Sequence, residues 1–232
     1  MKLTTSLAQL LKEKKIALIV SLPENNWELA RAAIESGVDA IKLHVNVEHR
    51  ASGNHFYATE AYRTEFHKIR SEFTGPLGIV PGGALESISE REMKELINCG
   101  FDYFSIYAHH MPGWMMSIDQ MEKTFAISAD YSFNILGNVK NMGITALEAS
   151  IIPGEEYGFP LTFKDALAYQ KLVQKVDVPV LVPSQRKLTP SDIPLLYQTG
   201  IKAIMLGAIV LGHDTQSIKK AVSSFRKAID SL

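Results

Sequence analysis

SGVDAIKL at residues 36–43, CGFDYFSI at 99–106, MGITALEA at 142–149 and TGIKAIML at 199–206 repeat one pattern along the chain. Each stretch has a glycine, an apolar residue, two variable positions and then an apolar run of strand length. A glycine in this place is typical of a helix that ends in the left-handed conformation just before the chain turns into a strand. The four stretches therefore predict a repeated helix-to-strand joint.

The same alternation of short apolar runs and helical periodicity extends over the whole chain. We expect strands at residues 17–22, 40–45, 77–80, 103–107, 125–129, 146–151, 180–182 and 203–206. We expect helices at residues 26–36, 59–73, 89–98, 162–175, 190–198 and 215–229. Eight strands alternating with helices predict an α/β fold, a single (β/α)8 TIM barrel with an extra N-terminal helix; a doubly wound open sheet is the alternative. No linker or charged block divides residues 1–232, so we expect one domain.

Composition narrows the classes of function. The 232 residues include 24 Lys and Arg against 25 Asp and Glu, a net charge of −1 that gives no field to attract nucleic acid or a membrane surface. The only cysteine, Cys99, cannot form an intrachain disulfide. We see neither the apolar core of a signal peptide nor an apolar run of membrane-spanning length. We therefore expect a cytoplasmic protein.

A candidate active site follows from the side-chain alternation on the strands. Lys42, His44 and Asn46 alternate with apolar residues, so they share the face that looks into the barrel, and Glu148 shares such a face with Ser150. A lysine and a glutamate inside a barrel are costly unless they are paired or lie near the wet mouth. We predict that Lys42 and Glu148 are catalytic; a buried ion pair that ties two strands is the alternative.

Further polar residues lie at the expected C-terminal ends of strands, where barrels carry their active sites. His44 and Asp130 are predicted as additional catalytic residues, although a hydrogen-bonded histidine and a helix-capping carboxylate are the structural alternatives. The predicted substrate-binding residues are Ser21, Asn46, Tyr107 and His109. No HxH or HExxH spacing is present, so we predict no metal site.

Three long loops should surround the mouth of the barrel, at residues 46–57, 108–119 and 152–161. They are rich in aromatic residues and methionine: Phe56, Tyr57, Met111, Trp114, Met115, Met116, Tyr157 and Phe159. These side chains fit either a lid over an apolar part of the ligand or a packed rim or dimer interface.

Two neighbouring segments near the C-terminus have the character of an anion site. MLGAIVLG at 205–212 is an apolar strand followed at once by small residues, and backbone amides exposed at such a turn bind phosphate. Ser184, Gln185 and Arg186 end the preceding strand and add donors and positive charge. A close-packed turn without a ligand is the alternative.

The segment 205–212 resembles the last-strand signature of the ribulose-phosphate-binding barrel superfamily, which includes indole-glycerol-phosphate synthase and the tryptophan synthase α subunit. The resemblance implies that Gly207 and Ala208 bind phosphate. The sequence departs from the pattern elsewhere: the first strand has no Lys-x-Ser-Pro-Ser segment, and SQRK replaces the usual glycine pair of the seventh loop.

These observations predict an enzyme that isomerises, epimerises or cleaves a small phosphorylated metabolite, with no cofactor. One alternative is transfer of a prenyl-type group onto a phosphorylated acceptor, which the aromatic and methionine-rich loops favour. The other is a barrel without catalysis that binds flavin mononucleotide (FMN) or phosphate. We expect a phosphorylated small molecule as the partner, no nucleic acid and no membrane, and leave a homodimer open.

Overall fold

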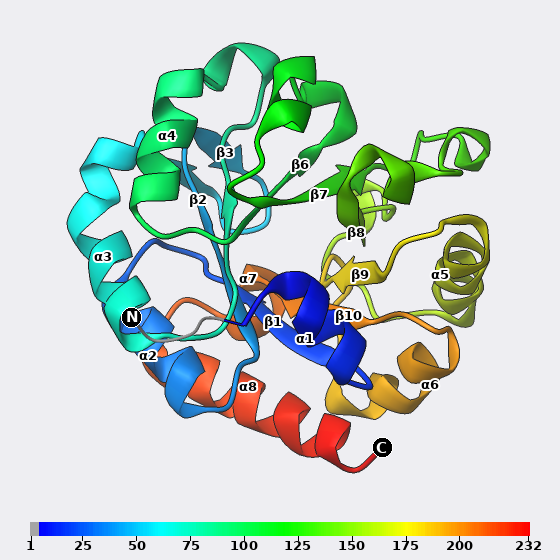
Figure 1. The fold of residues 1–232 in the computed structure, drawn as a ribbon. Helices are drawn as coiled ribbons and strands as arrows, with labels where there is room; N and C mark the ends of the chain where they lie inside the picture. The colour runs from blue at the N-terminus through cyan, green and yellow to red at the C-terminus, as the bar shows by residue number, and fades with distance from the viewer. Residues whose placement is uncertain (1–4) are drawn as a thin grey trace.

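The computed structural model describes residues 5–232, apart from the side chain of Phe133. Within them, eight parallel strands close into a barrel in the order β1-β10-β9-β8-β7-β6-β5-β2 (Figure 1). The barrel strands are β1 (Ala17–Ser21), β2 (Ala40–His44), β5 (Leu77–Val80), β6 (Tyr103–Tyr107), β7 (Glu122–Ile127), β8 (Ile144–Ala149), β9 (Val180–Pro183) and β10 (Ala203–Leu206). The predicted (β/α)8 barrel is therefore confirmed, and the open sheet is wrong.

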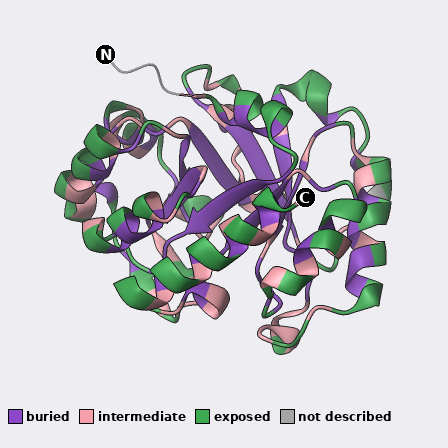
Figure 2. Cartoon of the chain, turned by 90° about the horizontal axis from the view of Figure 1, so that it is seen from below, coloured by how far each residue is buried: buried purple, intermediate pink, exposed green. Residues whose placement is uncertain are grey.

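Helices surround the barrel and cover the outward faces of the strands (Figure 2). They are α2 (Trp27–Glu35), α3 (Arg63–Glu72), α4 (Glu90–Asn98), α5 (Phe163–Lys175), α6 (Ile193–Gln198), α7 (Ala208–Leu211) and α8 (Thr215–Asp230). Short 3-10 turns take the place of α-helices between β6 and β7 and between β7 and β8. None of the helices in residues 5–232 is long and apolar enough to cross a membrane.

The four repeated glycines adopt the conformation that the sequence predicts. The φ angles of Gly37, Gly100, Gly143 and Gly200 are 89°, 85°, 79° and 84°. These values lie in the left-handed region, where a side chain would be strained. Each glycine follows a helix or 3-10 turn and precedes a barrel strand, so the backbone chemistry of one residue type sets four of the joints of the barrel.

The N-terminal helix closes one end of the barrel. In α1 (Leu7–Glu13), Leu7, Leu10 and Leu11 pack with the inward side chains near the starts of the strands, among them Tyr103. Glu122, at the start of β7, accepts hydrogen bonds from the backbone amides of Leu7 (2.6 Å) and Ala8 (2.9 Å), which have no partner within the helix. With this end filled, the interior is open at the C-terminal ends of the strands.

Several element boundaries differ from the sequence-based expectation, and two of the differences have a clear physical reason. β7 begins at Glu122 rather than at residue 125, because the polar side chains at its start bind α1 and β6 instead of solvent. The segment expected as a loop at 46–57 contains an antiparallel hairpin, β3 (Val47–His49) and β4 (Asn54–Phe56). Its strands have three residues each, which is too short for a periodic signal.

Candidate active site

A cavity of about 680 Å³ opens at the C-terminal end of the barrel. Every barrel strand contributes to its wall; the inward side chains are Ser21, Lys42, His44, Val80, Ser105, Tyr107, Ala126, Glu148, Pro183 and Met205. The inward face that alternation assigned to Lys42 and Glu148 is therefore the observed one. The three long loops also reach the cavity, with residues from the β3–β4 hairpin, the turn after β6 and the segment after β8.

An ion pair spans the floor of this cavity. Lys42 Nζ donates to Glu148 Oε1 (3.0 Å) and Oε2 (2.9 Å), and Ser105 Oγ donates to Glu148 Oε2 (2.7 Å). β2 and β8 lie four strands apart in either direction around the barrel, so the pair bridges its full width. The two side chains are only 5% and 8% exposed, yet both line the cavity. This arrangement places a compensated charge pair where a bound ligand can reach it.

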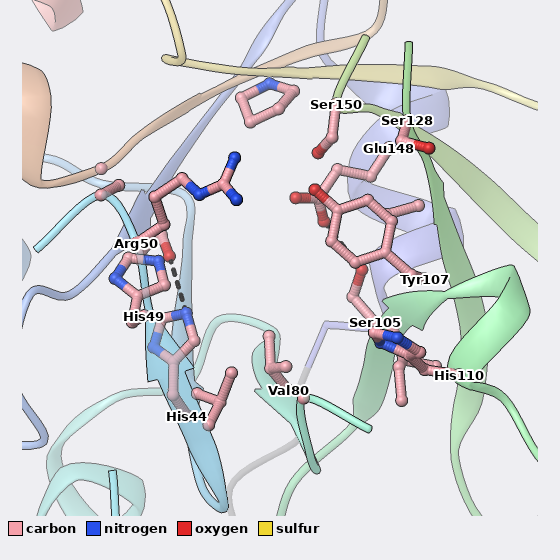
Figure 3. Close-up of a pocket in the computed structure, with 18 of the residues that line it drawn as sticks. His44, His49, Arg50, Val80, Ser105, Tyr107, His110, Ser128, Glu148 and Ser150 are labelled. Carbon is pink, nitrogen blue, oxygen red and sulfur yellow. Dashed lines mark hydrogen bonds between the residues drawn. The ribbon is translucent and has the colours of Figure 1, made fainter. Parts of the chain in front are cut away.

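His44 and His49 lie next to each other in the cavity wall (Figure 3), and His44 follows Lys42 by two residues on β2. Their ring centroids are 4.5 Å apart, and His44 Nε2 lies 3.4 Å from Ser21 Oγ. Burial lowers the pKa of His44 well below its usual value, with further lowering by His49 and Lys42. Burial and the Lys42 charge lower the pKa of His49 to about 4. Both imidazoles are therefore neutral at neutral pH, and buried His44 Nδ1 has no hydrogen-bond partner among the described residues.

The β6 side of the cavity carries hydroxyl and imidazole groups. Tyr107 stacks on His109 with a centroid distance of 5.4 Å, and burial raises the pKa of Tyr107 to about 12. Its hydroxyl therefore keeps its proton and remains a hydrogen-bond donor. Asp130 and Ser128 lie farther along the rim, and Asp130 is exposed to solvent.

The expected phosphate-binding residues divide into those that line the cavity and those that lie outside its wall. Ser184 and Gly207 line the cavity, and the Gly207 amide donates to Ser184 Oγ at 2.7 Å. Gln185 also lines the cavity, but its side chain accepts from the Ile152 amide (3.1 Å) and donates to the Tyr157 hydroxyl (2.5 Å). Its amide group thus holds the loop after β8.

Arg186, expected as a phosphate ligand, lies in an ion-pair network outside the cavity wall. Its guanidinium donates to both carboxylate oxygens of Asp165 on α5, at 2.9 and 3.0 Å, and to Glu156. Arg186 is buried and does not contribute to the cavity wall. Two carboxylates distant in sequence therefore occupy the guanidinium, and the expected role of Arg186 as a phosphate ligand stays a prediction. Ala208 is also buried and outside the wall, so only its backbone can serve an anion.

The amide side chain of Asn46 is also occupied. Asn46 lines the cavity, but its Nδ2 donates to Glu92 Oε2 at 2.5 Å, and Glu92 Oε1 binds Thr59. The residue ties the loop after β2 to α4. Only the side-chain carbonyl oxygen of Asn46 is then left for the expected role in substrate binding.

The aromatic and methionine-rich loops do not form an apolar lid. Of their eight aromatic and methionine residues, only Tyr157 contributes to the cavity wall. Phe56 and Met115 are buried in the protein core, whereas Tyr57 and Phe159 are 62% and 58% exposed. The feature that favoured prenyl transfer is therefore not part of this cavity.

Sequence reasoning missed His49 and Arg50, which the hairpin brings to the cavity. The signal that was available is the turn at Gly53, whose φ is 71°, between two short runs with alternating side chains. Among residues 5–232, no three His, Cys, Asp or Glu side chains gather as ligands for a metal ion.

Comparison with known proteins identifies the fold class. No protein-family model and no curated protein sequence matches the chain. Solved structures do match: Mycobacterium tuberculosis tryptophan synthase has a TM-score of 0.74 at 10% identity, over 97% of this chain and 98% of that one. Thiamine phosphate pyrophosphorylase from Pyrococcus furiosus has a TM-score of 0.65 at 14% identity, over 94% and 97%. KGPDC from Streptococcus mutans, solved in complex with a phosphorylated sugar, has a TM-score of 0.68 at 15% identity, over 94% and 99%.

At these identities the similarity shows a shared fold. The chain has the (β/α)8 barrel of these enzymes over nearly its full length. The shared fold is the barrel that the resemblance of residues 205–212 implies.

Proposed function

We propose that this protein is an enzyme that isomerises, epimerises or cleaves a small phosphorylated metabolite in the cavity at the C-terminal end of its barrel. The observation that carries the proposal is the Lys42–Glu148 pair, which is buried, bridges opposite strands and faces the cavity. A pair kept only to tie two strands does not require a cavity above it. A pair that acts on a ligand does.

The chemistry of the pair suits reactions that begin by moving a proton next to a carbonyl. The Lys42 ammonium stabilises an oxyanion that develops on the substrate, and Glu148 takes or gives the proton. Ser105 keeps the carboxylate oriented through its 2.7 Å hydrogen bond. Neutral His44 and the protonated hydroxyl of Tyr107 add an uncharged imidazole and a hydrogen-bond donor to the same cavity.

The proposed phosphate position is the start of α7, beside Ser184. The Ala208 amide donates to no acceptor among the described residues, and the Ser184 hydroxyl, which accepts from Gly207, retains its own proton for a ligand. Backbone amides at such a turn bind phosphate oxygens. The S. mutans KGPDC structure, which contains a phosphorylated sugar, supports a phosphorylated ligand in a barrel of this shape.

The proposal is tested in two steps. A thermal-shift screen compares phosphorylated sugars and hydroxy acids with their unphosphorylated forms; we expect only the phosphorylated members to raise the melting temperature. NMR in D2O then follows deuterium incorporation into the compounds that bind. Deuterium incorporation that is lost in Lys42→Met supports the proposal. Equal stabilisation by both forms of every compound, or incorporation that survives in Lys42→Met, contradicts it.

A further inference from the structure

Arg50 is a cation at the mouth of the cavity. It lies in the turn of the β3–β4 hairpin, and Figure 3 shows its guanidinium extending into the cavity toward the side of Glu148 and Ser150. Arg50 makes no hydrogen bond or ion pair with any described residue, although the acidic residues Glu48 and Asp130 also line the cavity. The guanidinium is therefore free to bind an anionic ligand.

The opposite side of the mouth has space for this guanidinium at Gly154. A Cβ atom built on Gly154 would lie 2.1 Å from Arg50 Nη1 and 3.2 Å from Arg50 Cζ. The φ angle of Gly154 is not in the left-handed region, so backbone conformation does not require a glycine here. What the absent Cβ leaves at this position is room for the end of the Arg50 side chain. The side chain thus crosses from the hairpin after β2 to the 3-10 turn after β8 (Gly154–Glu156).

This crossing runs above the ion pair on the cavity floor. Lys42 and Glu148 connect β2 and β8 inside the barrel, and Arg50 and Gly154 connect the loops that follow the same two strands. A ligand in the cavity is therefore enclosed between the pair below and the guanidinium above. The loop that carries Gly154 is held by Gln185, through the amides of Ile152 (3.1 Å) and Gly158 (2.9 Å).

We propose that Arg50 binds the phosphate of the substrate and makes the site specific for phosphate monoesters. This inference rests on the proposed function and assigns to Arg50 the part that the sequence pattern gave to Arg186, whose guanidinium is paired with Asp165 and Glu156. β8, β9 and β10 are neighbours in the barrel, so the tip of Arg50 is on the same side of the mouth as Ser184 and Gly207. The guanidinium fork pairs with two phosphate oxygens, while the Ser184 hydroxyl donates to a third.

The test measures binding of D-ribose 5-phosphate, with D-ribose as the uncharged control, by calorimetry on the purified protein. We expect Arg50→Gln to raise the Kd for D-ribose 5-phosphate by about ten- to a hundredfold, the loss of a charge-assisted pair. Arg50→Lys should restore part of the affinity, because a lysine supplies charge without the fork. Gly154→Ala should weaken binding at an unchanged melting temperature, because its Cβ displaces only the flexible end of Arg50.

Arg91→Gln is the matched control. Arg91 is 90% exposed on α4, away from the cavity, and its removal changes the net charge equally. If D-ribose 5-phosphate binds tightly and Arg50→Gln does not change its Kd, the role of Arg50 is overturned while the proposed function stands. An equal loss in Arg91→Gln also overturns it, because the effect is then one of net charge. If neither D-ribose 5-phosphate nor any other phosphorylated compound binds the unmodified protein, both proposals fail.

Discussion

Replacing Lys42 by methionine separates a catalytic ion pair from a structural one. The substitution keeps most of the side-chain volume and removes the ammonium that contacts Glu148 at 2.9 and 3.0 Å. If the pair is catalytic, turnover falls by about two to four orders of magnitude, the range for loss of a positioned acid-base or oxyanion group. Glu148→Gln should lower turnover to a similar extent while keeping the hydrogen bond from Ser105.

The loss of free energy of unfolding in Lys42→Met depends on the groups that remain unpaired in the barrel. Lys42→Met leaves a carboxylate that is 8% exposed with the Ser105 hydroxyl as its remaining partner. Removing one member of a buried pair destabilises a protein by about 3 to 5 kcal/mol. In the double variant Lys42→Met/Glu148→Gln no unpaired charge remains, so most of this stability should return.

The assay is the melting temperature and the turnover of the best-binding phosphorylated compound, measured on the two single variants and the double variant. We expect the double variant to recover melting temperature and to stay inactive. The catalytic interpretation is refuted if each single variant loses stability and keeps normal activity per folded molecule. It is equally refuted if the double variant regains activity.

Three further predictions concern the phosphate site, the histidines and the barrel interior. Ala208→Asp places a negative charge at the start of α7, so phosphorylated ligands should no longer raise the melting temperature. The uncharged variant Ala208→Asn should lose less of this ligand-induced rise. If the rise is undiminished in Ala208→Asp, the anion binds elsewhere. Because the folded protein lowers the pKa of His49 from 6.5 to about 4, the unfolded chain binds the proton more tightly, and the free energy of unfolding should fall by up to about 3 kcal/mol as the pH drops from 6.5 to 4. His49→Gln should flatten this fall in denaturant titrations, and an unchanged slope contradicts the assignment. Gly78→Ala would place a Cβ 2.1 Å from the Tyr103 ring, so the free energy of unfolding, measured by calorimetry, should fall by about 1 to 3 kcal/mol. Adding Tyr103→Leu should restore part of this stability. An unchanged free energy of unfolding in Gly78→Ala would show that the ring can move.

The features that were predictable from the sequence depend on local chemistry. The four left-handed glycines report their own backbone conformation, and alternation along a strand assigns each side chain to one face. For this reason the barrel, and the inward direction of Lys42 and Glu148, follow from short stretches of sequence.

The features that were missed depend on partners distant in the chain. Arg186 looked available at a strand end, but Asp165 on α5 and Glu156 in the loop after β8 bind it. Of the two interpretations of the aromatic and methionine-rich loops, the sequence alone could not exclude the apolar lid, since tertiary packing decides which loop side chains enter the core. Arg50 was missed because its hairpin has strands of three residues and gives no periodic signal.

The central claim is that a phosphorylated metabolite binds between the floor pair and the mouth of the barrel. A crystal structure of the protein with D-ribose 5-phosphate tests it most directly. The account predicts that the phosphorus atom lies between the start of α7 and the Arg50 guanidinium, with the sugar carbons above Lys42 and Glu148. A phosphate bound outside this cavity, or a sugar that does not approach Lys42, would contradict it.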